Sequence, residues 1–190
     1  MRCVRLDESS AGAALALFAR ESNTCYCRYH HFDGDKNAWL ARMFHEPEQN
    51  EREFLAMAKS DWLMGMVALG DDGSALGWMK ICEHRALRKL YDQRLYRGLP
   101  CFNGPREGVF TIGCFLVDER LRRRGVARAL LRAGLAQVRA EGGRAVEAFP
   151  RGAEGVPAAE LWTGPARLFL TEGFRVVNDF HPYPVLRLEL

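Results

Sequence analysis

The chain has 190 residues, of which 48% are hydrophobic and 27% are charged, and its formal net charge is +3. This length fits a single domain, residues 1–190, that can bury a sizeable core. The small net charge does not indicate a nucleic-acid-binding protein, and no apolar run approaches the ~20 residues of a membrane span. The first residues lack the apolar segment of a secretory signal. We therefore expect a cytoplasmic protein with no membrane partner, whose six cysteines are reduced.

Hydrophobic periodicity predicts strands and helices along the first 81 residues. The predicted elements are a strand over residues 2–6, a helix over residues 11–20 capped by Ser9 or Ser10, helical residues 36–59 broken near Pro47, and strands 62–69 and 75–81 around a D-D-G-S turn. Because the last two strands form a hairpin, we expect them to be antiparallel neighbours.

The segment over residues 23–34, N-T-C-Y-C-R-Y-H-H-F-D-G, combines thiols, histidines and aromatic rings. Its spacing does not match the cysteine and histidine pairs of structural zinc sites, so we expect no metal. We expect Tyr26 and Tyr29 either to line a substrate pocket or to pack in the core. Trp78, in the second hairpin strand, is a further candidate for substrate contact.

A long connection over residues 83–107 follows the hairpin and carries more basic than acidic residues. Connections of this length are usually functional or partly helical. We interpret this one as a lid over an acceptor pocket, and its positive balance favours an acceptor with a carboxylate or a phosphate. The alternative is a solvated helical face.

Residues 109–142 organise the rest of the chain. Residues 109–117 carry no charge and are mostly β-branched or aromatic, which is typical of a buried strand. A charged turn follows, and an amphipathic helix is predicted from Val126 onward, until Gly142 and Gly143 end it.

The turn between this strand and this helix has the features of an anion site. The first N–H groups of a helix have no intrahelical partner and lie at the positive end of its dipole. Gly125 allows an anion to approach the backbone closely, and Ala127 is nearly as small. Arg122, Arg123 and Arg124 add positive charge. From these residues alone, a phosphate site and a solvated basic turn both stay open.

The turn R-R-R-G-V-A, residues 122–127, resembles the R/Q-x-x-G-x-G/A motif of the GCN5-related N-acetyltransferase (GNAT) superfamily. The resemblance implies that the backbone of this turn, at Gly125, Val126 and Ala127, holds the pyrophosphate of acetyl-coenzyme A (acetyl-CoA). It also implies that the strand end bonds the pantetheine arm of acetyl-CoA. The strand-end residues in question are Phe115, Leu116 and Val117.

The C-terminal third supplies the remaining elements. They are predicted as a fifth strand over residues 144–150, a loop over residues 151–163, a short helix between Pro165 and Gly173, and two final strands. The segment L-F-L-T-E-G-F, residues 168–174, resembles the second motif of the same family. The resemblance implies the GNAT fold: a mixed, mostly antiparallel α/β (α+β) sheet of six or seven strands, flanked by helices and splayed between the fourth and fifth strands.

Two positions depart from the family's pattern. Phe169 stands where many members have a tyrosine that protonates the leaving thiolate, and Trp162 stands where an asparagine is frequent. Phenylalanine has no proton to donate, so Tyr183, Tyr26 or water would take over that role.

The implied reaction is direct attack of a neutral amine on the thioester of acetyl-CoA. An amine pKa near ~10 makes a base useful at neutral pH. Glu147, in the fifth strand, is our first candidate for the base. Glu83 and His84 are the next, and a base acting through water is the alternative. Backbone N–H groups near Phe115 and Leu116 are the predicted oxyanion donors. We expect Cys114 to be a small buried residue rather than a nucleophile.

The chain is therefore predicted to be an N-acetyltransferase that transfers the acetyl group of acetyl-CoA, in a ternary complex, to a primary amine of a small molecule or a peptide. The alternatives are a non-catalytic acyl-CoA-binding module, which the substitution at Phe169 favours, and a transferase of a longer acyl group. We expect no metal and no nucleic-acid partner, and either a monomer or a homodimer.

Overall fold

The computed structural model describes residues 1–152, 155, 157 and 160–190, so part of the loop expected over residues 151–163 lies outside the described residues. The helices are α1 Glu8–Arg20, α2 Lys36–His45, α3 Pro47–Ala58, α4 Arg88–Tyr91, α5 Val126–Ala140 and α6 Ala166–Thr171. The strands are β1 Arg2–Arg5, β2 Met66–Leu69, β3 Ala75–Glu83, β4 Val109–Val117, β5 Ala145–Ala148, β6 Arg175–Asn178 and β7 Val185–Glu189. The described residues also form the 3-10 turns η1 Tyr29–His31, η2 His84–Leu87, η3 Pro100–Phe102 and η4 Glu119–Leu121. Within the described ranges, no helix has the length and apolar character needed to cross a bilayer.

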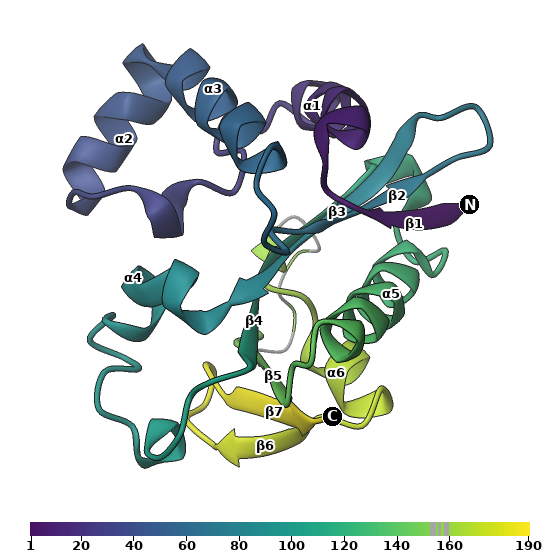
Figure 1. The fold of residues 1–190 in the computed structure, drawn as a ribbon. Helices are drawn as coiled ribbons and strands as arrows, with labels where there is room; N and C mark the ends of the chain where they lie inside the picture. The colour runs from purple at the N-terminus through teal and green to yellow at the C-terminus, as the bar shows by residue number, and fades with distance from the viewer. Residues whose placement is uncertain (153–154, 156, 158–159) are drawn as a thin grey trace.

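The seven strands form one sheet in the order β1-β2-β3-β4-β5-β7-β6 (Figure 1). Neighbouring strands run antiparallel, except that β4 and β5 run parallel. A parallel pair needs a crossover connection, and α5 supplies it. The predicted mixed, mostly antiparallel sheet of the GNAT fold is confirmed.

The sheet opens between β4 and β5 because β4 carries a bulge. Cys114 lies opposite Lys80, but the next paired residue is Ile112, so Gly113 has no partner on β3. The pairing of β4 with β5 also ends at Ile112. A bulge bends its strand and interrupts local pairing, so residues 113–117 diverge from β5. This is the predicted splay between the fourth and fifth strands.

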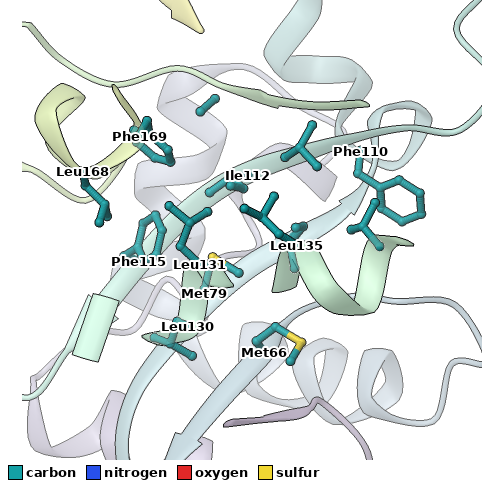
Figure 2. Packing of buried hydrophobic residues seen from close by; sticks show 14 of the residues in the cluster. Met66, Met79, Phe110, Ile112, Phe115, Leu130, Leu131, Leu135, Leu168 and Phe169 are labelled. Carbon is teal, nitrogen blue, oxygen red and sulfur yellow. The ribbon is translucent and has the colours of Figure 1, made fainter. Parts of the chain in front are cut away.

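Apolar side chains pack on both faces of the sheet. On one face, α5 and α6 cover a cluster that includes Met79 (Figure 2). On the other face, Phe18 of α1 and Phe54 of α3 pack against the ring of Trp78. Gly134 allows α5 to approach the sheet closely, since a Cβ at this position would lie 2.4 Å from the Cε atom of Met79.

The cap of the first helix differs from the prediction of Ser9 or Ser10. Asp7 is the N-cap, and its Oδ1 accepts a hydrogen bond from the Ser10 N–H at 2.9 Å. Ser10 Oγ accepts one from the Asp7 N–H at 3.0 Å. The pair forms a capping box, so the serine is the third helical residue and α1 begins one turn earlier than the apolar pattern suggested.

The expectation that all six cysteines are reduced is wrong for two of them, because Cys27 and Cys114 form a disulfide. These residues are 87 positions apart in the sequence. They meet because the segment after α1 folds over the face of β4 where Cys114 points, and the sequence does not reveal this contact. Cys114 is 8% exposed, in line with the expected small buried residue.

Candidate active site

A cavity of about 850 Å³ lies where β4 diverges from β5. Eight of the nine predicted cofactor-binding residues line it, namely residues 115–117, 122–123 and 125–127, and Arg124 does not. The opposite wall comes from Leu161 and Trp162 and from the start of α6. Such a volume is typical of a small-molecule or cofactor site.

The turn that precedes α5 presents unsatisfied backbone donors to this cavity. Gly125 is the N-cap with φ 87°, and no side chain caps the helix. Arg123, two residues earlier, also has a positive φ of 62°. The left-handed backbone at Gly125 carries no Cβ, and nothing lies within 4 Å of the place where one would be. The N–H groups of the first turn of α5 are thus free to bind an anion.

The arginines around the turn divide into anchored and free side chains. Arg122 donates to Glu21 at 3.3 Å and to the Val117 carbonyl at 3.4 Å, so it braces the turn. Arg123 and Arg167 line the cavity, and neither forms an ion pair with any part of the chain that the structure describes. Their free charges add to the positive potential of the helix N-terminus.

The strand wall of the cavity is held by a bond across the opening. The Phe115 N–H donates to the Trp162 carbonyl at 2.6 Å. The oxyanion donor expected at Phe115 is therefore occupied in this structure. Trp162 also lines the cavity. It stands at the position where the family's pattern has an asparagine.

Phe169 is a core residue behind the cavity lining and has no proton to donate. Its side chain is fully buried and packs against Phe115 and Phe174, with ring centroids 6.1 and 5.3 Å apart. The buried ring leaves this position without an acid.

Acetyl-CoA fits the residues that line the cavity. Its pyrophosphate matches the uncapped N–H groups and the free arginines, and its pantetheine arm matches the apolar strand end at residues 115–117. No Cβ fills the approach at Gly125. By contrast, no three His, Cys, Asp or Glu side chains of the described residues cluster as metal ligands.

Glu147, predicted as the base, lies on β5 with a fully buried side chain. Its carboxylate accepts bonds from Arg106 at 2.7 and 2.9 Å, from Arg187 at 2.9 Å and from the Tyr91 hydroxyl at 2.6 Å. This carboxylate is the first of the predicted candidates for the base. Two arginines and a phenol donate to the two carboxylate oxygens, so the geometry favours a structural ion-pair network.

This network ties the connection over residues 83–107 to the sheet. Arg106 lies over the rings of Tyr91 and Phe102, at 5.1 and 5.2 Å from the centroids. Burial and the neighbouring Glu147 carboxylate raise the pKa of Tyr91 well above its ordinary value, so this phenol stays a hydrogen-bond donor. The connection contains η2, α4 and η3, in agreement with its expected partly helical character.

The other predicted site residues lie away from the cavity. Glu83 ends β3 and pairs with Arg85, and Tyr183 is 37% exposed in the turn before β7. Tyr26 and Trp78 are 9% and 0% exposed and pack in the core. The side chains of Tyr26 and Trp78 pack in the core, so Tyr29 is the remaining candidate among the residues predicted to contact the substrate.

Sequence reasoning missed one residue near the opening of the sheet. Lys80 lies on β3 opposite Cys114, and only 1% of it is exposed. The signal was a single lysine within the otherwise apolar stretch L-G-W-M-K-I-C, where a buried charge needs a partner.

Comparison with known proteins agrees with this geometry. The model of the acetyltransferase (GNAT) family matches residues 25–163, which is more than half of the chain. No curated protein matches the chain.

Several solved structures have a similar fold. The GCN5-related N-acetyltransferase from Kribbella flavida aligns over 100% of this chain and 97% of its own, with a TM-score of 0.54 and 22% identity. The PaiA N-acetyltransferase from Thermoplasma acidophilum, solved in complex with coenzyme A, aligns over 100% and 98%, with a TM-score of 0.56 and 10% identity. The GNAT domain of PAT from S. lividans aligns over 99% and 89%, with a TM-score of 0.58 and 16% identity. At these identities the likeness is one of fold, and it is the family match that assigns the chain to the GNAT family of acetyl-CoA-dependent acetyltransferases.

Proposed function

We propose that this protein transfers the acetyl group of acetyl-CoA to a primary amine of a small molecule or a peptide. The observation that carries the proposal is the uncapped, left-handed turn at Gly125, which opens into a cavity beside the bulged end of β4. A phosphate-binding helix start and an opened sheet edge lie together there, as binding of a long phosphorylated thioester requires.

In this proposal the first N–H groups of α5, with Arg123 and Arg167, bind the pyrophosphate. The strand end at residues 115–117 lies along the pantetheine arm, and Trp162 shields the opposite side from water. Acetyl-CoA supplies the activated carbonyl and a thiolate leaving group. The chain contributes chiefly position, since holding the two reactants at attack distance lowers the barrier by itself.

The amine attacks directly in a ternary complex, and its proton leaves before or during attack. Glu147 is bound by two arginines, so we propose that it holds the connection over residues 83–107 in place as a lid over the acceptor pocket. Residues 1–190 form a single domain in this proposal. Glu83 and Tyr183 lie outside the cavity lining, so either would transfer a proton to or from the reacting groups through water. The variants Glu83→Gln and Tyr183→Phe test them through the pH dependence of kcat, in which removal of a titrating catalytic group abolishes one limb.

The test is acetyl transfer to a panel of primary amines and peptides, followed by thiol release and by mass spectrometry of the acetylated product. We expect at least one amine to gain a single acetyl group at a rate proportional to protein concentration. Gly125→Asp, which puts a carboxylate where pyrophosphate is proposed to bind, should lose this activity. Gly73→Asp is the matched control, because Gly73 also has a positive φ and no atom within 4 Å of its Cβ position. Acetyl-CoA binding without acetylation of any amine would contradict the proposal.

A further inference from the structure

A group of buried basic side chains lies on the face of the sheet opposite α5. We call Arg28, His30, His31 and Lys80 the basic cluster. Along β3, Met79 and Ile81 point toward α5, so Lys80 points to the other face. Its stem lies against the bulge of β4, since a Cβ at Gly113 would be 3.1 Å from the Lys80 Cγ.

The basic cluster has almost no negative charge to balance it. Lys80 is 1% exposed, and the one hydrogen-bond partner of its ammonium within the described residues is the Met57 sulfur at 3.0 Å. Arg28 lies 3.6 Å from the same sulfur and uses its Nε on Glu53 at 3.1 Å. Glu53 is shared with Arg42, whose Nη2 lies 2.6 Å away. One carboxylate therefore serves two arginines, and none is left for Lys80.

The two histidines have buried nitrogen atoms without partners. His30 is 9% exposed, and its Nδ1 has no hydrogen-bond partner among the described residues; the same holds for His31 Nε2. Burial, together with the charge of Lys80, lowers the pKa of His30 to about 4 and that of His31 to about 2. Each neutral ring can still donate one N–H. Buried polar groups are almost always satisfied, so these donors require an explanation.

The position of the cluster connects it to the proposed reaction. Lys80 lies opposite Cys114, and the next two residues of β4 line the cofactor cavity. The segment 29–34 also contacts the lid, because Lys89 of α4 donates to the carbonyls of Phe32 and Gly34 at 2.8 and 2.6 Å. The cluster thus lies between the lid, the segment after α1 and the bulge of β4.

We propose that the basic cluster binds a carboxylate of the acceptor, so that the substrate is an amine that also carries a carboxylate. The lysine supplies the balancing charge, and the N–H groups of His30 and His31 orient the carboxylate. The Lys80 ammonium is the charge of the cluster that has no carboxylate partner within the described residues, and a singly charged carboxylate would pair with it. The statement that this carboxylate belongs to the acceptor rests on the proposed acetyl transfer. The statement that the basic cluster binds an anion is independent of it.

The anion site is tested by nuclear magnetic resonance of the histidine Cε1–H signals during titration with acetate, the carboxylate alone. Acetamide is the neutral control of the same shape. His30→Gln and His31→Gln assign the two signals, and the other three of the five histidines are internal references. We expect saturable shifts of the His30 and His31 signals with acetate only. Absence of these shifts, or equal shifts with acetamide, would overturn the proposal.

Lys80→Met removes the charge at similar side-chain length, and Lys80→Gln is the second variant. Both should abolish the acetate response, whereas Lys59→Met, which removes an exposed lysine, should retain it. A response that survives loss of Lys80 would also overturn the proposal.

The assignment to the acceptor is tested with α-amino acids and their carboxamides as matched acceptor pairs. We expect acids to be acetylated with at least tenfold higher kcat/KM, and Lys80→Met to erase the difference. Equal use of acids and amides, with acetyl-CoA binding intact, would refute this inference alone. Loss of acetyl-CoA binding itself, seen by calorimetry, would instead refute the proposed function.

Discussion

Lys80 is predicted to cost the protein stability at neutral pH, and Lys80→Met should recover it. Burial lowers the pKa of Lys80 from 10.5 to about 8, with Arg28 as a further lowering charge. The difference between these two values, at about 1.4 kcal/mol for each pH unit, amounts to about 3 kcal/mol. Replacement of an unpaired buried charge by an apolar side chain of similar length therefore stabilises the fold.

The effect depends on pH in a direction that the two pKa values fix. The unfolded chain binds the lysine proton more tightly than the folded protein does, so protonation favours unfolding. The full penalty is present below pH 8, declines between pH 8 and 10.5, and is absent above 10.5. The neighbouring Cys82 thiol is coupled to this lysine, because burial raises the pKa of the thiol and the charge of Lys80 lowers it.

Urea denaturation, followed by circular dichroism in a buffer without carboxylates, measures this difference at pH 7, 9 and 10.5. We expect Lys80→Met to exceed wild type by about 3 kcal/mol at pH 7 and to equal it at pH 10.5. Lys59→Met, at an exposed site, should change stability by less than ~0.5 kcal/mol. A variant that is less stable than wild type at pH 7, or a difference that is the same at every pH, would refute the reasoning.

Three further changes have expected outcomes. Glu147→Gln leaves Arg106 without a carboxylate partner and Arg187 with Glu189 alone, and it should lower the free energy of unfolding by about 3 kcal/mol. Glu189→Gln, at an exposed carboxylate, should lower it by less than ~1 kcal/mol, and similar losses in urea denaturation would contradict the network. Cys27→Ser removes a disulfide that closes a loop of 87 residues, and it should lower the free energy of unfolding by up to about 4 kcal/mol. Cys25→Ser, at a free cysteine of the same segment, is the control. Equal stability of the two variants in thermal melts without reductant would count against the disulfide. Gly125→Ala should lower the free energy of unfolding by about 1 kcal/mol, because φ at this residue is positive. It should keep the affinity for acetyl-CoA within a few-fold of wild type, since the added Cβ would meet no atom within 4 Å. Complete loss of binding would show that the turn has another geometry.

The sequence was informative where local chemistry decides the structure. Periodicity identified β4 and α5, and Gly125 marked the turn between them, because the left-handed N-cap of α5 is a local backbone requirement. Periodicity also placed the break at Pro47, which is the first residue of α3.

Contacts between distant segments were not visible in the sequence. The partners of Glu147 are Tyr91, Arg106 and Arg187, which are distant from it in the sequence, so the sequence showed a candidate base but not its ion-pair network. The disulfide of Cys27 and Cys114 and the burial of Lys80 likewise depend on how the segment after α1 covers the sheet. Each of these requires tertiary structure, which residue spacing alone does not encode.

The most direct test of the central claim is titration calorimetry of acetyl-CoA against wild type, Gly125→Asp and Gly73→Asp. We expect wild type and Gly73→Asp to bind one acetyl-CoA with the same affinity. Gly125→Asp should bind at least tenfold more weakly, a loss of ~1.4 kcal/mol or more, because its carboxylate opposes the pyrophosphate. Equal binding by all three proteins would place the pyrophosphate elsewhere, and no binding by wild type would contradict the account of the cavity.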